Sequence, residues 1–155
     1  MISMNNYNKD PKMEGFIIRD YRKEDYRQVL SIWESTGMGG KERGDDEQVI
    51  ERSIQMGGKL LILEKKTGGE IIGTSWMTYN GRRIYLHHFG IKPEFQKKGL
   101  GYNLGLASIK IAQEKKCQIK MEVHRSNLAG IKLYKKLGFD FLGDYKVLIM
   151  RDPIS

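Results

Sequence analysis

The sequence predicts an α+β fold, a single domain whose mixed, mostly antiparallel sheet is flanked by about four helices. Three observations lead to this prediction. Apolar residues recur every three or four positions in four segments, the period of an amphipathic helix, and they alternate or run together in shorter segments typical of strands. Short glycine-containing turns join three successive strand segments, which predicts a meander. One strand–helix–strand unit predicts a parallel pair.

Length and composition fit one domain without disulfides. The chain has 155 residues and a single cysteine, Cys117, so no intrachain disulfide can form. Residues 1–14 are polar and aperiodic, and we expect a flexible tail there, followed by the domain at 15–155. The sequence has no signal-like start and no apolar run of membrane length, which favours a cytoplasmic protein.

The chain is basic, with 27 Lys and Arg against 19 Asp and Glu and a formal net charge of +8. Such an excess attracts polyanions, including RNA, membrane surfaces and phosphorylated cofactors. It does not choose among them, because acidic residues are interspersed with the basic ones in most segments. A solvated surface is therefore the expectation for any single pair of lysines.

Two helices separated by a glycine-rich loop follow the first predicted strand, Phe16–Asp20. Apolar spacing from Tyr26 onward predicts the first helix, which should end at Gly37. The loop at 37–44 contains too many glycines for a regular element and should be mobile, as loops that shape substrate pockets often are. Asp45, with a glutamine three residues later, resembles a capping pair that would begin the second helix.

The remaining elements form the meander and a C-terminal α+β part. In chain order they are strands at 60–64, 70–79 and 84–91, a helix from Gly101 to Lys116, a strand at 118–123, a helix at 128–137 closed by Gly138, and strands at 139–142 and 145–150. Asn80-Gly81 is a strong hairpin signal between the second and third of these strands. Because a helix connects 84–91 to 118–123, those two strands should run parallel.

The stretch Gln96-Lys97-Lys98-Gly99-Leu100-Gly101 predicts an anion site. It follows a strand and opens a helix, whose first free N–H groups and positive dipole end point at whatever lies there. Its two glycines let the backbone approach a ligand closely, and its two lysines add charge. A phosphate or pyrophosphate is the expected ligand.

A second block, Asn127 followed by Leu133-Tyr134 and Gly138-Phe139, lies about one helix and one strand downstream of the loop. The loop and this block together resemble the GNAT superfamily of N-acetyltransferases. The family's loop signature, Gln or Arg, two residues, Gly, one residue, Gly or Ala, is matched by Gln96, Gly99 and Gly101. Its second block, Asn, a spacer, Leu-Tyr and then Gly-Phe, is matched from Asn127 to Phe139. The resemblance covers nearly the whole domain.

The resemblance implies acetyl-CoA as co-substrate, an amine of a small molecule or peptide as acceptor, no metal, and a monomer or homodimer. The loop amides would hold the CoA pyrophosphate, the backbone of Phe89 and Ile91 would pair with the pantetheine arm, and Tyr134 would donate a proton to the leaving thiolate. The implied cofactor-binding residues are Phe89, Ile91, Gln96, Lys97, Lys98, Gly99, Leu100, Gly101, Asn127 and Tyr134. Asn127 is also well suited to cap its helix.

Elementary chemistry supports the same roles. An amine that attacks a thioester needs a free lone pair, a site for the developing oxyanion and a proton for the departing thiolate. Tyr134 can supply that proton, because the reference pKa of a tyrosine, about 10, lies within roughly two units of that of a thiol. Gly90 would permit a strand bulge whose N–H groups polarise the thioester. A tyrosine that only packs in the core is the alternative for Tyr134, and the matched block favours the acid.

Three residues compete for the role of general base. Glu122 stands in Met-Glu-Val-x-x-Ser-Asn, which resembles the ribosomal-protein alanine acetyltransferases, where the matching glutamate acts as base, here through water. An exposed or ion-paired carboxylate is an equally good interpretation. His87 and His88 are the rivals, since some amine acetyltransferases use a histidine on the matching strand. Neighbouring strand residues face opposite sides, so at most one should point into the cleft.

The alternative function is a non-catalytic CoA-sensing or RNA-binding domain of the same shape. RNA binding normally needs aromatic residues interleaved with basic ones on one face, and the sequence shows no such run, so nucleic acid is not an expected partner. A nucleotide-binding dehydrogenase would need a third glycine and a mostly parallel sheet. Asn103 and Gly105 depart from the apolar residues usual in the family, and nothing recognisable at 37–44 or Tyr145 specifies the acceptor.

Overall fold

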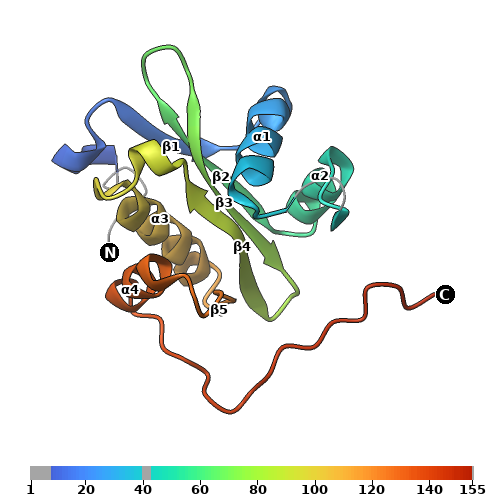
Figure 1. Cartoon of the computed structure of the whole chain (residues 1–155). Coiled ribbons are helices and arrows are strands. Elements are labelled where there is room, and N and C mark those ends of the chain that lie inside the picture. Colours follow the sequence, from blue (N-terminus) through green and yellow to red (C-terminus); the bar gives the residue numbers. More distant parts are fainter. Residues whose placement is uncertain (1–7, 40–42, 155) are drawn as a thin grey trace.

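The computed structural model describes residues 8–39 and 43–154 and shows a sheet between two pairs of helices (Figure 1). The strands are β1 (Phe16–Asp20), β2 (Lys59–Lys65), β3 (Ile71–Tyr79), β4 (Arg83–Ile91) and β5 (Gln118–Met121), in that order across the sheet. The helices α1 (Tyr26–Thr36) and α2 (Glu47–Gln55) cover one face, and α3 (Leu100–Glu114) and α4 (Leu128–Leu137) cover the other. Strands β1 to β4 are antiparallel and β5 runs parallel to β4, which confirms the predicted fold class.

Each face of the sheet has its own apolar core. Trp33 and Trp76 lie in the core beneath α1 and α2, with their rings stacked 5.3 Å apart. Leu104 and Ile111 belong to the core beneath α3. Residues 71–77 of β3 are all buried, because this central strand is covered on both faces. Within the described ranges, no helix combines the length and the apolar character that crossing a membrane requires.

The end of α1 agrees with the prediction from the sequence, whereas the N-terminal cap of α2 differs from it by one residue. Gly37 closes α1 in the left-handed region, with φ 69, as predicted. The cap of α2 is Asp46, whose Oδ1 accepts the N–H of Val49 at 2.9 Å, and not Asp45. Asp45 is therefore available for a contact elsewhere. Part of the expected mobile loop, residues 40–42, lies outside the described residues.

Residues 8–14 pack against the domain. Met13 is fully buried in the core beneath α3. Oδ2 of Asp10 accepts the side-chain N–H of Asn103 at 2.9 Å, and this hydrogen bond lowers the pKa of Asp10. The part of the expected tail that the structure describes is thus a fixed segment, and the buried Asn103 has a partner. Residues 1–7 lie outside the described range.

The unusual Gly105 of α3 has a packing reason. A Cβ added at Gly105 would lie only 2.4 Å from Cδ1 of Leu137, the last residue of α4. The missing side chain lets the two helices approach, which outweighs the cost of about 1 kcal/mol that glycine carries inside a helix. This close approach fixes α4, and with it Tyr134, against the sheet.

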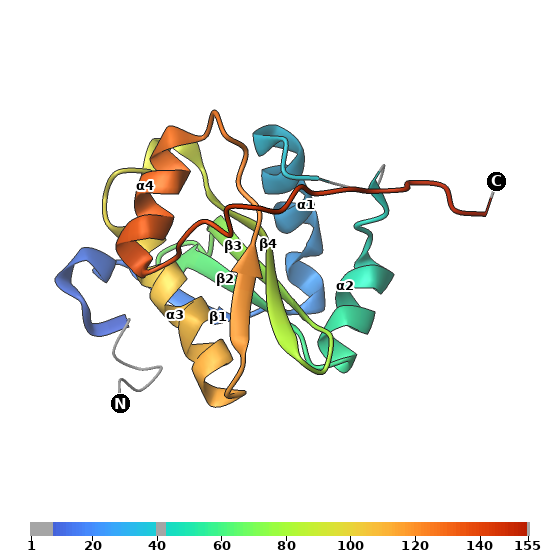
Figure 2. The same cartoon turned by 90° about the horizontal axis from the view of Figure 1, so that it is seen from below.

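The structure contradicts the strands predicted at 139–142 and 145–150. Both stretches lack strand pairing, and a turn at Gly143 and Asp144 bends the chain between them. Beyond that turn the chain runs outward past the body of the domain (Figure 2). Apolar and β-branched residues favour extended backbone, but a strand also needs a neighbour for its N–H and C=O groups, and no described strand pairs here. We call residues 139–154 the C-terminal arm.

Candidate active site

The predicted anion loop connects β4 to α3 by way of a short turn, Pro93–Phe95. Gly99 precedes α3 with φ 82, and no side chain caps this helix, so its first N–H groups carry no side-chain partner. Lys97 is also left-handed, with φ 61. Left-handed residues between ordinary ones turn successive N–H groups to one side, a geometry that binds anions. The loop therefore has the backbone shape of a phosphate site.

Gln96 holds the loop against the end of β4. Its side-chain amide donates to the carbonyl of Ile91 at 2.9 Å, and its backbone N–H donates to the carbonyl of Pro93 at 3.2 Å. Both of its donor groups are thus engaged within the protein. Gln96 is a positioning residue for the loop rather than a visible ligand contact.

A third lysine joins Lys97 and Lys98 at the loop. The aliphatic part of Lys12 covers Gly99, and a Cβ added at Gly99 would lie 2.5 Å from Cδ of Lys12. The sequence predicts no role for Lys12, because its segment has the composition of a tail. The available signal was Asp10 followed by a proline, a typical start of a helical turn, and Asp10 does cap one.

β4 and β5 separate beside this loop. Their parallel pairing ends at Leu86 and Met121. Residues 87–91 consequently have no strand on that side within the described chain, and their backbone groups can pair with an extended ligand. This stretch contains Phe89 and Ile91, whose backbone the family resemblance implies would pair with the pantetheine arm.

A bulge interrupts β4 at His88 and Phe89, which together face the single residue Ser75 of β3. His88 has φ 33, a left-handed conformation that is uncommon outside glycine and marks local strain. The sequence predicts a bulge in this strand with Gly90 as the permissive residue. The bulge is present, but its strained residue is His88, and Gly90 has no positive φ.

The bulge turns both histidines toward the α1 and α2 face. The ring centre of Trp76 lies 5.8 Å from that of His87 and 5.3 Å from that of His88. The two neighbouring side chains therefore do not face opposite sides of the sheet as expected, because side chains alternate strictly only in a regular strand. The next residue, Phe89, contacts the ring of Tyr134 at 5.8 Å and belongs to the other face.

His88 is fixed from several sides by residues distant in sequence. Its Nε2 lies 2.7 Å from Oδ2 of Asp45, and its ring meets the ring of Trp33 edge-on at 4.6 Å. The hydroxyl of Thr74 donates to the carbonyl of His88 and accepts the indole N–H of Trp33, both at 2.9 Å. A Cβ added at Gly39 would lie 2.7 Å from both Asp45 and His88, so the loop backbone closes over the pair.

The pairing with Asp45 orients the imidazole of His88. When the carboxylate accepts the Nε2 proton, Nδ1 carries the lone pair of the neutral ring. Among the described residues no hydrogen bond reaches this Nδ1. An imidazole held at one nitrogen by a carboxylate can accept a proton at the other. No local motif signals this pair, because the two residues stand 43 positions apart.

Glu122 ends a row of polar side chains on the same face as His88. It directly follows β5, is exposed, and accepts the hydroxyl of Tyr85. Tyr85 stacks on His87 at 4.6 Å, and Nε2 of His87 lies 2.8 Å from the hydroxyl of Thr78. Burial raises the pKa of Tyr85 and lowers the pKa of His87, so both rings are neutral near neutral pH.

Tyr134 lies on the opposite face of β4. It is 9% exposed and stands edge-on to Phe89 and Phe139, with ring centres 5.8 and 6.3 Å away. Burial raises the pKa of Tyr134, so its hydroxyl keeps its proton at neutral pH. The side chain of Asn127 accepts the N–H of Gly130 at 2.9 Å, which confirms that it caps α4.

The two predicted catalytic residues lie on the wall of one open cavity of about 870 Å³. Glu122 and Tyr134 both line it, together with Tyr85 and residues of the C-terminal arm. His87 and His88 are not among its lining residues. The cavity lies along β5 and the C-terminal arm, and its lining includes Tyr85 of β4 but none of residues 87–91.

Comparison with known protein families identifies the family in which this combination of loop, separated strands and cavity occurs. The model of the GNAT acetyltransferase family matches residues 18–139. The chain belongs to the GNAT family. It is therefore an acetyltransferase of the acyltransferase class, with acetyl-CoA as its co-substrate.

Solved structures of other GNAT proteins share the fold at low sequence identity. A predicted acetyltransferase from Clostridium acetobutylicum, solved with acetyl-CoA, has TM-score 0.68 and 16% identity over 86% of this chain and 96% of its own. The ribosomal-protein-S18-alanine N-acetyltransferase of Escherichia coli has TM-score 0.67 and 19% identity over 81% and 77%. Glucosamine-6-phosphate N-acetyltransferase of Arabidopsis thaliana has TM-score 0.62 and 18% identity over 87% and 95%.

Proposed function

We propose that this GNAT protein transfers the acetyl group to a primary amine of a small molecule, peptide or protein by direct attack, without a covalent enzyme intermediate. The observation that carries the proposal is that Glu122 and Tyr134, the two candidate catalytic residues, line the same open cavity. The neighbours named for glucosamine-6-phosphate and for ribosomal-protein alanine act on amino groups of unlike acceptors. They support the reaction class and leave the acceptor open.

The loop and the strand edge fit the co-substrate. The N–H groups at the start of α3, with Lys97, Lys98 and Lys12 around them, would hold the pyrophosphate. The backbone of residues 87–91 would pair with the pantetheine arm. A side chain at Gly99 would require a left-handed conformation and displacement of Lys12, which explains the glycine. Bound acetyl-CoA supplies the acetyl group as a thioester.

Tyr134 would act as the general acid. Its raised pKa keeps the hydroxyl protonated over the neutral range, so a proton is present for the sulfur when the thiolate leaves. Its position against Phe89 places it beside the strand edge that would carry the pantetheine. The bulge at His88 and Phe89 would contribute backbone N–H groups to the developing oxyanion.

Glu122 would act as the general base through a water molecule. It is exposed at the cavity wall, where water and an incoming amine can both reach it. The hydroxyl of Tyr85 donates to its carboxyl group and fixes its orientation. The pair of His88 and Asp45 is the competing base, favoured by the 2.7 Å contact that leaves Nδ1 without a partner among the described residues.

Calorimetric titration with acetyl-CoA tests the donor half of this proposal. We expect saturable binding of one acetyl-CoA per chain, and turnover when an amine is added. Absence of binding heat would contradict the assignment of the loop. Binding without turnover for every amine would instead support a non-catalytic CoA-sensing domain. Binding of RNA that weakens steeply with salt would support the nucleic-acid alternative.

A further inference from the structure

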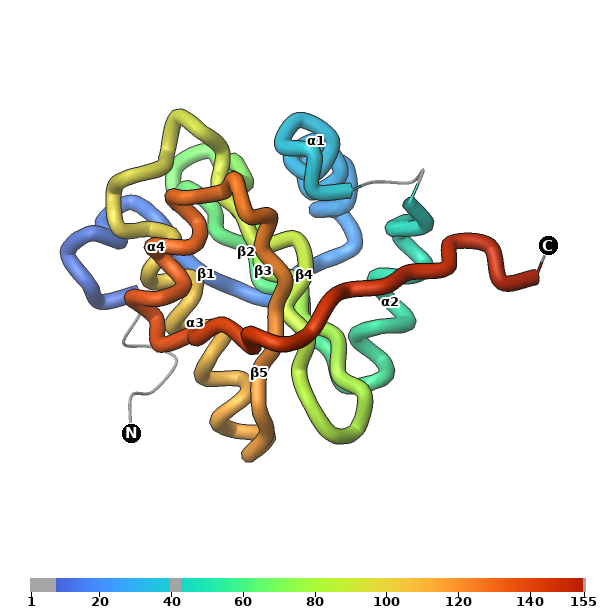
Figure 3. Tube along the Cα trace, turned by 60° about the horizontal axis from the view of Figure 1, so that its bottom comes forward, coloured from blue at the N-terminus to red at the C-terminus, as the bar shows by residue number. Residues whose placement is uncertain are grey.

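Residues 8–14, which we call the N-terminal segment, are fixed beside the loop that precedes α3 (Figure 3). Near its start, Oδ1 of Asn8 accepts the backbone N–H of Ile18 in β1 at 2.9 Å. Near its end, Met13 is fully buried in the core beneath α3. A polar segment with so few apolar residues is ordinarily loose. Its attachment at both ends therefore indicates a role for the residues between them.

Four residues close a ring of contacts between this segment and the loop. Oδ1 of Asp10 accepts the backbone N–H of Lys12, and Oδ2 accepts the side-chain amide of Asn103, both at 2.9 Å. The same amide of Asn103 donates to the carbonyl of Gly99 at 3.1 Å. The side chain of Lys12 lies over Gly99, where an added Cβ would be 2.5 Å from its Cδ. The position of Lys12 is thus coupled to the loop by way of Asp10 and Asn103.

Asn103 is an unfavourable residue for its position in α3. Its side chain belongs to a residue that is only 2% exposed, and a buried amide lowers stability unless its polar atoms are paired. Asparagine is also a weaker helix former than leucine. The amide group offsets these costs by joining Asp10 to the carbonyl of Gly99. We therefore attribute the asparagine to this connection.

Asp10 carries the wrong charge to bind an anion itself. On electrostatic grounds alone, its carboxylate weakens the binding of any phosphate near Lys12. Its two hydrogen bonds instead fix the backbone from which Lys12 extends. Ordering a loose segment costs conformational entropy, and a segment that is fixed before the ligand arrives avoids this cost during binding. Asp10 therefore suits a positioning role.

Aromatic rings join the same segment to the loop at a second place. Phe16, at the start of β1, meets the ring of Phe95 edge-on, with ring centres 6.1 Å apart. Phe95 belongs to the turn just before the loop, and the ammonium of Lys98 lies 5.5 Å from its ring centre. Lys12 and Lys98 are therefore both held by residues that connect the N-terminal part of the chain to the loop.

We propose that the N-terminal segment is a clasp for a phosphate group of acetyl-CoA, in which Asp10 and Asn103 are positioning residues that hold Lys12 over the loop. Lys12 is exposed and supplies the charge, whereas Asp10 and Asn103 act only through it. The clasp rests on the proposed function, because the loop is assigned there to the phosphates of the co-substrate. CoA carries a pyrophosphate and a phosphate on its ribose, and the experiments below tell which of them Lys12 meets.

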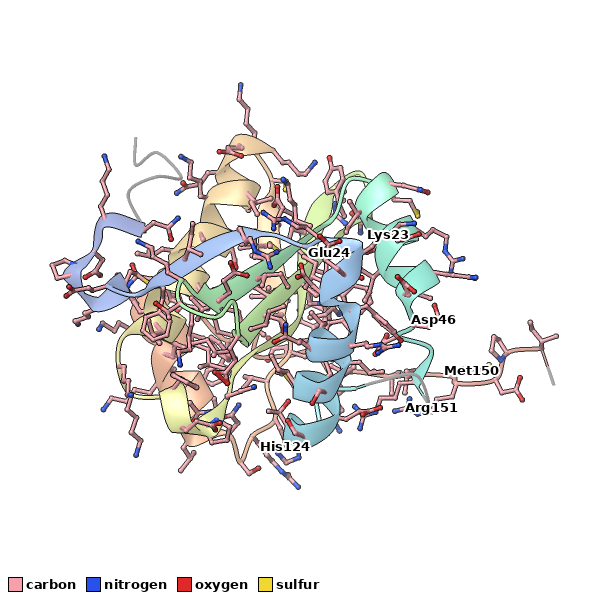
Figure 4. All side chains as sticks on the ribbon, turned by 90° about the horizontal axis from the view of Figure 1, so that it is seen from above. Lys23, Glu24, Asp46, His124, Met150 and Arg151 are labelled. Carbon is pink, nitrogen blue, oxygen red and sulfur yellow. The ribbon has the colours of Figure 1, made fainter. Side chains whose placement is uncertain are left out.

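The clasp lies far from the acceptor side of the protein. Figure 4 shows Asp46 at the start of α2 and Met150 of the C-terminal arm at the end of the domain opposite to the N-terminal segment. Changes in the clasp should therefore alter the affinity for acetyl-CoA and leave the KM for the amine unchanged.

Calorimetric titration of two variants with acetyl-CoA separates positioning from charge. Asp10→Asn and Glu14→Gln each remove one negative charge from the segment, and Glu14 is exposed. Asparagine can still cap the turn, but its amide nitrogen cannot accept the bond from Asn103. We expect Asp10→Asn to bind acetyl-CoA a few-fold more weakly, and Glu14→Gln to bind it at least as tightly as the unchanged protein. Equal or tighter binding by Asp10→Asn would overturn the clasp.

A double-mutant cycle tests whether Asn103 acts through Lys12. We expect Asn103→Leu to weaken acetyl-CoA binding a few-fold in the unchanged protein and to have no further effect in Lys12→Met. The same fold-change in both backgrounds would show that Asn103 acts on the loop directly, through Gly99, and would overturn its positioning role.

Titration with acetyl-dephospho-CoA, which lacks the ribose phosphate, identifies the phosphate that Lys12 meets. Equal affinities of Lys12→Met and the unchanged protein for this compound would place Lys12 at the ribose phosphate. A loss equal to that seen with acetyl-CoA would place it at the pyrophosphate, and both results support the clasp. If the donor site itself is wrongly assigned, the unchanged protein will not bind acetyl-CoA. If only the clasp is wrong, every variant will bind it equally.

Hydrogen exchange provides a readout that does not depend on turnover. The N–H groups of Lys12 and Met13 donate to Oδ1 and to the backbone carbonyl of Asp10, respectively. We expect these amides to exchange more slowly when acetyl-CoA binds, because a ligand stabilises the conformation that it prefers. They should exchange faster in Asn103→Leu without ligand. Slowing confined to residues 96–101 would show that the ligand does not engage the segment and would overturn the proposal.

Discussion

The donor side and the acceptor side of β4 are built in different ways. The donor side is backbone from one continuous stretch, the loop at 96–99 and the first turn of α3. The proposed acceptor side is made of side chains from separate elements, of which Asp45, His88 and Glu122 are the candidates for proton transfer. Substitutions on the donor side should therefore change affinity for acetyl-CoA, and those on the acceptor side should change turnover and its pH dependence.

Tyr134 contacts Phe89 on the donor side and lines the same cavity as Glu122, and its loss should have the largest effect. We expect Tyr134→Phe to lower kcat by on the order of 10² with nearly unchanged affinity for acetyl-CoA, because only the proton for the thiolate is removed. Steady-state kinetics and calorimetry measure the two quantities. Phe139→Leu, at the ring that Tyr134 contacts, is the control for lost packing. Equal turnover of the unchanged protein and Tyr134→Phe would reassign Tyr134 to packing.

The pH dependence of kcat in variants of the two candidate bases shows which of them acts on the acceptor side. We expect Glu122→Gln to lower kcat about tenfold and to remove the acidic limb of the rate profile, because the proposed general base is lost while the attacking amine can still give its proton to solvent. His88→Asn keeps a residue that tolerates the left-handed backbone and should retain that limb. If His88→Asn alone removes the limb, the base is the pair of His88 and Asp45.

Burial of Tyr134 raises its pKa, and this predicts how kcat behaves at alkaline pH. Its pKa lies above the ordinary value, so the protonated acid persists in the folded protein beyond pH 10. Between pH 8 and 9, Tyr134 itself should cause almost no loss of kcat, because its pKa lies above the ordinary value of about 10. The same raised pKa stabilises the fold below the unfolded pKa of about 10, and this contribution declines as pH rises above it. An alkaline limb below pH 9 that vanishes in Tyr134→Phe would contradict the assignment.

Alanine substitutions at two glycines with the same φ angle test whether the loop binds acetyl-CoA. Gly99 and Gly68 both have φ 82, but only Gly99 adjoins the loop, where Lys12 covers it. Alanine at either position should destabilise the fold by about 1–2 kcal/mol, the cost of a left-handed residue. We expect Gly99→Ala alone to weaken acetyl-CoA binding, by roughly tenfold. Equal affinities of the two variants would place the phosphates elsewhere.

The smallest expected effect concerns Lys12. Lys12→Met keeps the aliphatic cover over Gly99 and removes the charge, so we expect acetyl-CoA to bind a few-fold more weakly, with a reduced salt dependence. Lys9→Met removes a charge from the same segment at an exposed residue and serves as the control. Calorimetry at two ionic strengths compares them. Identical salt dependence of both variants would remove Lys12 from the site.

The two sides also differ in how far the sequence predicts them. The donor loop is local, so the role of Gly99 and the start of α3 follow from residues next to one another in the sequence. The orientation of His88 depends on a bulge set by pairing with β3, which strand periodicity does not contain. Asp46 caps α2, so the neighbouring Asp45 can contact His88 instead. Capping rules alone do not tell which of two adjacent aspartates is the cap.

The conformations of the segment around Lys12 and of the C-terminal arm also depend on residues distant in sequence. Lys12 and its neighbours read as a tail because few apolar residues mark the segment, yet the single buried Met13 anchors it. The arm has the composition of strands at 145–150, but composition does not supply the neighbouring edge that a strand requires. In both places the outcome depends on distant partners.

The measurement that tests the central claim most directly is amine-dependent release of the CoA thiol. The protein is incubated with acetyl-CoA and a panel of free amino acids, polyamines, aminoglycosides and peptide N-termini, and acetylated acceptor is followed by mass spectrometry. We predict thiol release that requires at least one of these amines, matches acetylated product one to one, and falls by about 10² in Tyr134→Phe. Tight binding of acetyl-CoA with no amine-dependent thiol release would contradict the account.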